Sequence, residues 1–483
     1  MTATPGSKPA RSAAASTAVL DRADATPHEV AAAVVAAIGA GVAPARAASR
    51  LCVARLHNTP QRLHNAWITL DDALRAAAEA QHDRAALPVA IAAGLLVAAP
   101  ATIYTGEGRA SSLDAPEIAG DPVGAALTVR AMLAADSTPA AVETALVAWL
   151  YRSPTRLGHL APLVAAVVSL RASVEPEAGA DLLASLAATM AEAAAVDPGP
   201  LALAHAERIA PILAAAAQVF AAEEPSKAAA FQEPRFRAHL VDGDPATAER
   251  ALAKALAFGV PRALVCGSLA LAAAERLLRF DEAVDASPYR RETWADVAWL
   301  LRLCEAARRL EVRHCAPGWL GLALYCAWAI QVGAALDAPI ESRLALPEPL
   351  ALPPSWDHGP EVARVVLAMQ RGDATAAMGA LRAYLLMGLP ETPLGSAMIE
   401  AALTLPRAGS VDAQVAAVGL ASSAVDAGLA LGTHPHRERV WAAALRALAA
   451  PRADNALATL VLTQLGGATA STSVPWPWLA THT

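Results

Sequence analysis

The stretch Gly243–Pro261, GDPATAERALAKALAFGVP, decides the fold, because it recurs without a gap at Gly372–Pro390 as GDATAAMGALRAYLLMGLP. Related segments begin at Gly120 (GDPVGAALTVRAMLAADST) and at Thr26 (TPHEVAAAVVAAIGAGVAP). Self-similarity of this kind is typical of repeat proteins, in which each copy is one supersecondary unit. The sequence therefore predicts about four copies of one module.

Every copy carries the signals of a helix. A residue whose side-chain oxygen can accept an amide hydrogen stands at the start, as expected of an N-cap: Thr26, Asp121, Asp244 and Asp373. Proline, which is favoured at the first helical position, follows in three copies: Pro27, Pro122 and Pro245. Apolar residues then recur every fourth position, and glycine suited to a left-handed cap ends three copies: Gly41, Gly259 and Gly388.

Composition favours an all-α fold. Apolar residues make up 55% of the 483 positions and aromatic residues only 4%, with alanine and leucine supplying most of the apolar mass. After the capped helix we expect three more helices in each module, over 44–56, 62–80 and 85–99 in the first and over 262–279, 292–311 and 317–336 in the third. One module cannot bury its own apolar face, so the modules must stack into an irregular α-solenoid or a toroid.

The expected organisation is a tail, four modules and an arm. Residues 1–25 form a disordered tail, the modules cover 26–118, 119–240, 241–360 and 361–452, and residues 453–483 form a C-terminal helix and an extended arm that contains Trp476 and Trp478. The modules are unevenly spaced, which predicts inserted segments at 102–120, 221–241 and 339–360. Inserted segments of repeat proteins commonly lie near a binding face.

Charge and cysteine usage limit the function classes. The net charge of −7 is spread along the chain without a basic stripe, so we expect no nucleic acid partner. Lysine occurs only at positions 8, 227 and 254; we attribute the resulting arginine excess to genome composition and derive no chemistry from it. The five scattered cysteines and the lack of a signal peptide indicate a cytoplasmic protein. The uncharged stretches Ala85–Gly106 and Cys315–Leu336 are interpreted as buried helices, with no membrane contact.

Two histidines stand at matching places. His64 and His159 each lie 38 positions after their caps, Thr26 and Asp121, where a third helix begins. Two imidazoles and a carboxylate, here Asp71, are the donor set of a non-haem iron site. Iron or another divalent metal is therefore the one cofactor we consider. The alternative is that both histidines are capping or core residues.

Tryptophans gather in the third module. Trp294, Trp299, Trp319 and Trp328 lie close together in an otherwise alanine-rich sequence, and Asp296 lies on the helix that corresponds to those of the two histidines. Tryptophan offers a large contact area and one hydrogen-bond donor, so these five residues are candidates for a ligand-binding pocket. The alternative is simple core filling.

The run Ala248–Asp285, AERALAKALAFGVPRALVCGSLALAAAERLLRFDEAVD, with the helix around Asp296, resembles the large helical region fused to Rieske-type iron–sulfur domains in some bacterial proteins. It is more distantly similar to questin-oxidase-like proteins. The family's Thr-His-Ala motif reads Thr293-Trp294-Ala295 here, and paired Cys-x-His motifs occur nowhere. The resemblance therefore implies a relative that keeps the scaffold and binds or assists, as a pseudoenzyme does.

Two hypotheses follow. The first is a binding or accessory protein in bacterial natural-product biosynthesis, including modified-peptide maturation. It holds a peptide or small molecule on its inner face, works beside a partner enzyme and is a monomer or small oligomer. The second is a metal-dependent oxidoreductase of the non-haem iron type that uses His64 and His159. Elemental analysis of the purified protein distinguishes them, because only the second requires stoichiometric metal.

Overall fold

The computed structural model describes residues 19–20, 25–55, 60–79, 89, 118–135, 137–174, 176–215, 220, 223–285, 293–343, 345–350, 357–404 and 411–450. Within these ranges the regular elements are all helices, and the strand-like pairing is limited to one antiparallel bridge between Phe280 and Asp337. The predicted all-α class is therefore confirmed.

The capping signals act as the sequence predicts. Thr26, Asp121, Asp244 and Asp373 are N-caps, and each side chain accepts a hydrogen bond from a backbone amide of the first turn. The three glycines that were expected to end helices have positive φ angles: Gly41 at 92°, Gly259 at 81° and Gly388 at 65°. Local chemistry thus sets both ends of the repeated helix.

Each of the last three modules contains four main helices. In the second module they are α6 (Pro122–Ala134), α7 (Pro139–Arg152), α9 (Ala161–Ser173) and α10 (Pro176–Ala195). In the third they are α15 (Pro245–Ala257), α16 (Arg262–Arg279), α18 (Trp294–Arg313) and α19 (Trp319–Val332). In the fourth they are α21 (Ala374–Leu386), α22 (Glu391–Thr404), α23 (Val411–Leu431) and α24 (Glu438–Ala449). In each of these modules the first helix packs against the last. The first module has α2 (Pro27–Gly39), α3 (Pro44–Arg55) and α4 (Pro60–Glu79); its expected fourth helix lies outside the described residues, apart from Val89.

Other elements join the modules. Short turns α8 (Pro154–Leu157) and η2 (Gly158–Leu160) link α7 to α9, and α11 (Gly199–Ala214) and α13 (Pro225–Ala230) follow α10. In the third module α17 (Glu282–Asp285), η3 (Gly333–Leu336) and η4 (Ile340–Ser342) are also short. Helices α14 (Glu233–Asp242) and α20 (His358–Gln370) precede α15 and α21. Helix α14 packs on α15, α16 and α19 of the third module.

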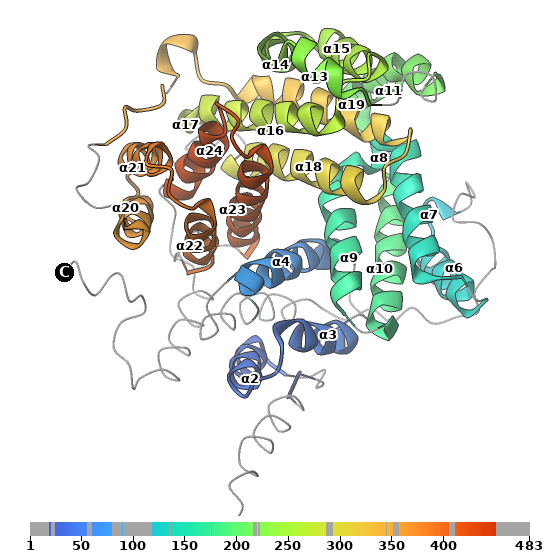
Figure 1. Ribbon diagram of the computed structural model, residues 1–483. Coiled ribbons are helices and arrows are strands. Elements are labelled where there is room, and N and C mark those ends of the chain that lie inside the picture. Colours follow the sequence, from blue (N-terminus) through green and yellow to red (C-terminus); the bar gives the residue numbers. More distant parts are fainter. Residues whose placement is uncertain are drawn as a thin grey trace, which may run out of the picture.

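The third helices of the four modules meet in a closed cycle. Helix α4 contacts α9, α9 contacts α18, α18 contacts α23, and α23 returns to α4. Figure 1 shows the modules placed around these four inner helices, with α14 and α15 on the outside. An open solenoid would leave α4 and α23 apart, because only neighbouring repeats touch in it. The described helices therefore form a ring, the second of the two arrangements that the sequence allowed.

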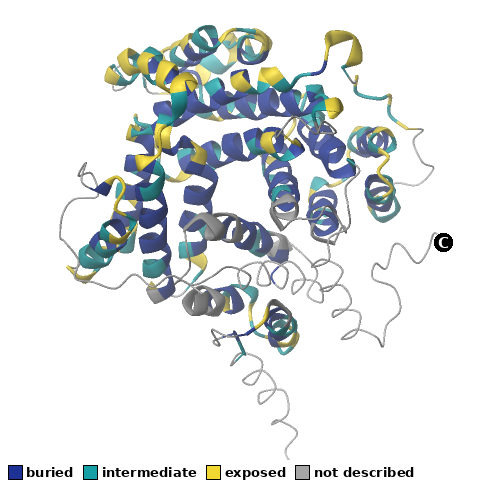
Figure 2. Ribbon diagram, turned by 180° about the vertical axis from the view of Figure 1, so that it is seen from behind, coloured by how far each residue is buried: buried dark blue, intermediate teal, exposed yellow. Residues whose placement is uncertain are grey.

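Burial follows this arrangement. Figure 2 shows buried residues on the helices that face the interior and exposed residues on the outermost elements. Of the described helices, Trp319–Leu336 is long and apolar enough to cross a membrane, and the bent pair Ala178–Ala195 and Gly199–Ala214 passes the same test only if counted as one span. In the first of these, 67% of the residues are buried inside the protein, where α19 packs against α15 and α18. The region is thus a core helix, as its sequence predicted.

Candidate functional site

The inner helices carry charged side chains into the interior of the ring. Helix α4 supplies Asp71, Asp72 and Arg75, which are spaced so that they share one side of the helix. Helix α18 supplies a second set with similar spacing: Arg302, Glu305, Arg308 and Arg309. Helix α23 supplies one acid, Asp426. We call these eight residues the central charge cluster.

Ion pairs within the cluster join helices that are far apart in sequence. Arg309 Nη2 donates to Asp71 Oδ2 at 2.8 Å, which connects α18 to α4. Arg75 donates to Asp72 on its own helix and to Asp426 on α23. Asp71 and Asp72 are only 2% and 3% exposed. Buried carboxylates need such partners, because an unpaired charge in the interior costs several kcal/mol.

Burial leaves part of the cluster incompletely paired. Desolvation raises the pKa of the Asp72 carboxyl above its ordinary value, against the opposing charges of Arg75 and Arg302. The Nη2 atom of Arg302 is buried without a hydrogen-bond partner, and its guanidinium lies where a side chain at Gly419 of α23 would be. Polar groups of this kind specify how helices fit together more than they stabilise them.

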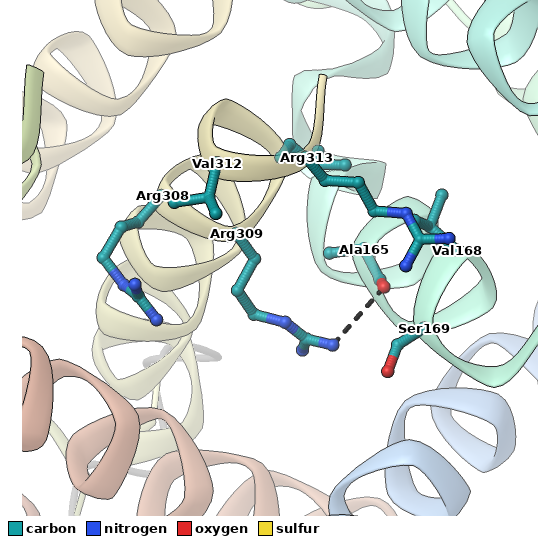
Figure 3. A pocket seen from close by; sticks show the side chains of 8 residues that line it. Ala165, Val168, Ser169, Arg308, Arg309, Val312 and Arg313 are labelled. Carbon is teal, nitrogen blue, oxygen red and sulfur yellow. Dashed lines mark hydrogen bonds between the residues drawn. The ribbon is translucent and has the colours of Figure 1, made fainter. Parts of the chain in front are cut away.

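A cavity of about 220 Å³ opens beside the cluster, between α9 and α18. Its charged lining consists of Arg308, Arg309 and Arg313, and its other lining residues are Ala165, Val168, Ser169, Leu310 and Val312. Figure 3 shows Arg309 extending from α18 to the Ala165 carbonyl of α9, and Arg313 extending alongside α9. The lining therefore combines cations, one hydroxyl and apolar side chains, without a carboxylate.

Two of these arginines, Arg308 and Arg313, keep donors that have no partner among the described residues. Arg308 holds Glu305 through Nε and Nη2, and Arg313 holds Glu143 through Nε at 3.0 Å. A guanidinium has five N–H donors, so Arg308 Nη1 and both terminal nitrogens of Arg313 remain for another acceptor. Such donors match the two oxygens of a carboxylate or phosphate. The cavity can therefore bind an anionic group that carries an apolar part.

Glu143 of α7 anchors one wall of this cavity. Its buried carboxylate accepts hydrogen bonds from His314 Nε2 at 2.7 Å, from Arg313 and from Arg171. Burial alone would raise the pKa of Glu143, but the hydrogen bonds from His314 and Arg171 and the nearby arginine charges hold it below its ordinary value of 4.5. The carboxylate is thus more stable as an anion in the folded protein than in the unfolded chain.

This lowered pKa predicts acid sensitivity. Because the folded-state pKa lies below the unfolded value, the contribution of Glu143 is present above pH 4.5 and is lost as the pH falls through the folded pKa. We expect Glu143→Gln to lower the free energy of unfolding by about 2 kcal/mol at pH 7, and the deficit to shrink in more acidic buffer. Urea unfolding at several pH values measures this. The exposed Glu207→Gln is the control, and a deficit that does not change with pH would contradict the assignment.

The structure brings only part of the expected metal site into the interior. Asp71 is buried, and its oxygens face Arg309 and Arg75. His159 lies on η2, outside the four inner helices, and is exposed, although desolvation by neighbouring atoms lowers the pKa of its imidazole. His64 lies on α4, and its side chain is outside the described part. The described residues contain no group of three or more His, Cys, Asp or Glu side chains that could hold a metal ion.

The four tryptophans of the expected pocket and Asp296 each make separate contacts. Trp294 packs against Phe280 with ring centroids 4.3 Å apart, and Trp319 Nε1 donates to the Ala307 carbonyl at 2.8 Å. Trp328 stacks on His205, Trp299 packs against the core, and Asp296 completes the N-terminal cap of α18 through Thr293. These contacts agree with the alternative of core filling and helix capping.

The three arginines that line the cavity were not among the candidate residues of the sequence analysis. The segment ARRLEVRH places Arg308, Arg309 and Arg313 near one end of the helix that was compared with those of the histidines. Their closeness on one helix was the signal, and the interpretation of arginine as genome composition hid it. Comparison of the chain with models of known families, with characterised proteins and with solved structures finds no match.

Proposed function

We propose that the protein is a binding protein that holds the anionic group of a peptide or small molecule in the cavity between α9 and α18. The observation that carries this proposal is the cavity lining: three arginines that share the space with apolar residues and no carboxylate. The arginines would bind the anion through paired hydrogen bonds, while Val168, Leu310 and Val312 would contact the apolar part of the ligand.

The ring suits a binding role, because the cavity lies on helices that are fixed by their neighbours. Arg309 is held by Asp71 and Ala165, and Arg308 is held by Glu305. Side chains that are already ordered lose less conformational entropy when a ligand binds. We propose further that the ligand is a peptide or metabolite of natural-product biosynthesis. This part rests on the family resemblance alone, and a precursor-peptide gene beside this gene would support it.

Binding of a matched pair of peptides tests the proposal. We expect acetyl-Leu-Leu with a free carboxylate to bind at least tenfold more tightly than its carboxamide, because only the former presents an anion to the arginines. Arg308→Gln and Arg313→Gln should each weaken the carboxylate peptide about tenfold, without changing the weak binding of the amide. Isothermal titration calorimetry measures both affinities.

The control is Arg371→Gln, at an exposed arginine that follows α20 and lies outside the cavity lining. It removes the same charge from the chain, so it should leave the affinity unchanged. Equal binding of acid and amide, or equal losses in the control and in the cavity variants, would overturn the proposal. Circular dichroism spectra of all variants show whether each has folded.

A further inference from the structure

A second arginine-lined space lies beside α16, where the third and fourth modules meet. One cavity of about 300 Å³ is lined by Leu278, Arg343, Ala345 and Leu346, and another of about 230 Å³ by Pro234, Arg237, Ala238, Val241 and Asp242. Glu275, Arg279 and Arg439 line both. Because they share these residues, we treat the two cavities as adjoining parts of one groove, which we call the junction groove.

Two of the segments that the sequence identified as insertions border this groove. Arg237 lies on α14, within the expected insertion 221–241, and Arg343 lies within the insertion 339–360. The second segment is fixed on α21, because Leu350 N donates to the Gly379 carbonyl at 3.1 Å and Arg382 donates to the Pro347 carbonyl. These two segments therefore contribute the end arginines, Arg237 and Arg343, while α16 and α24 of the repeated modules contribute the shared residues Glu275, Arg279 and Arg439.

The lining of the junction groove carries more cations than carboxylates, although Glu233 and Asp337, outside the lining, pair with Arg237 and Arg343. The lining contains four arginines against two carboxylates, Asp242 and Glu275. Glu275 accepts from both Arg279 and Arg439 and so neutralises the middle of the groove. Arg237 lines only one cavity and Arg343 only the other, so each end presents its own cation. This distribution suits a ligand with separated negative charges.

The end arginines are held in place and still have donors. Arg237 uses Nη1 for Glu233 at 2.8 Å, and Arg343 uses Nε for the Ala338 carbonyl at 3.1 Å. Arg237 Nε and Nη2, and Arg343 Nη1, have no partner among the described residues and can bind a carboxylate. Apolar residues lie beside each end arginine: Val241 lines the cavity of Arg237, and Leu278 lines that of Arg343. A lining that combines cations with apolar side chains suits a peptide better than a free inorganic anion.

From this geometry we infer that the junction groove binds an extended acidic peptide segment, with carboxylates at the two ends of the groove. The inference is independent of the ligand in the α9–α18 cavity, because the two sets of lining residues do not overlap. A protein with two such sites holds one molecule in the ring and docks a second through its acidic segment.

Fluorescence anisotropy of a fluorescein-labelled hexaglutamate peptide tests the inference, with hexaglutamine as the uncharged probe. Hexaglutamate presents a carboxylate at every residue, so the test does not depend on knowing how the acidic residues of the ligand are spaced. We expect hexaglutamate to bind and hexaglutamine not to bind. The affinity for hexaglutamate should fall with added salt. Arg237→Gln and Arg343→Gln should each weaken binding about fivefold to tenfold, and Arg343→Lys should lose less than Arg343→Gln.

Two further variants separate this site from the α9–α18 cavity. Arg308→Gln and Arg371→Gln should bind hexaglutamate as the unmodified protein does. The inference is overturned if hexaglutamate and hexaglutamine bind alike or if the groove variants bind hexaglutamate normally. It is also overturned if inorganic phosphate at equal charge competes as strongly as unlabelled hexaglutamate, because the groove would then be a simple anion site. Loss of binding in Arg308→Gln alone would place the peptide in the other cavity.

Discussion

Replacing Arg446 with methionine should lower the free energy of unfolding by about 4 kcal/mol, since the guanidinium joins α24 to the end of α16. Arg446 is 6% exposed. It donates to the carbonyls of Leu277, Leu278 and Phe280, which include carbonyls of the last turn of α16. The last carbonyls of a helix lack the regular partner one turn ahead, although the Leu277 carbonyl also accepts from the Phe280 amide at 3.4 Å. A cation at a helix C-terminus also interacts favourably with the helix dipole. Methionine fills similar space without a donor, so several buried carbonyls lose their hydrogen bonds.

Urea unfolding followed by circular dichroism measures this loss. Arg446→Lys should recover about half of it, because an ammonium group reaches fewer carbonyls than the planar guanidinium. Arg371→Met, at an exposed arginine, should stay within about 0.5 kcal/mol of the unmodified protein. A change of less than about 1 kcal/mol in Arg446→Met would mean that α24 does not cap α16.

A valine at position 428 should destabilise the protein by about 3 kcal/mol, because α23 has no room there. A Cβ atom on Gly428 would lie within 2.8 Å of three atoms of the Trp441 indole. Trp441 is fully buried, and Gly395 of α22 lies on another side of its ring, so the indole cannot move aside without disturbing both helices. The glycine is thus required by a close approach of α23 and α24.

The double variant Gly428→Val with Trp441→Leu provides the test of cause. If the clash with the indole is responsible, the valine should cost much less when leucine replaces Trp441, and the two changes will not be additive. Gly39→Ala is the matched control in a helix, since a Cβ atom there meets nothing within 4 Å. It should stabilise the protein by about 0.5–1 kcal/mol through the higher helix propensity of alanine. Full additivity of the two changes would contradict the packing explanation.

Local signals made the modules predictable, whereas long-range contacts could not be predicted. Asp244 and Gly259 act through atoms a few positions away, so their roles could be inferred from spacing alone. The order of helices in the third module follows the expected ranges for the same reason. In contrast, Arg309 and Asp71 are 238 positions apart, and nothing local indicates that α18 faces α4. Ring closure depends on such contacts.

The candidate site shows the same limit. The partner expected for Asp71 was a metal ion, and the structure places Arg75 and Arg309 beside its carboxylate. Matching distances after a cap predicted equivalent roles for His64 and His159. The inserted turns α8 and η2 place His159 at the surface instead, before α9 begins. Spacing along the chain identifies equivalent positions only where no extra turn intervenes.

A double-mutant cycle between Arg75 of α4 and Asp426 of α23 tests ring closure most directly. These residues are 351 positions apart and belong to the first and last modules, yet their side chains form an ion pair. The unfolding free energies of Arg75→Gln, Asp426→Asn and the double variant should give a coupling of about 1 kcal/mol, since the pair is partly exposed and screened. A second cycle between Arg75 and Glu438 is the control. Glu438 belongs to the same last module but pairs with Arg382, so the coupling free energy between Arg75 and Glu438 should be zero. Additive effects of Arg75→Gln and Asp426→Asn would mean that the first and last modules do not meet, and the array would then be an open solenoid.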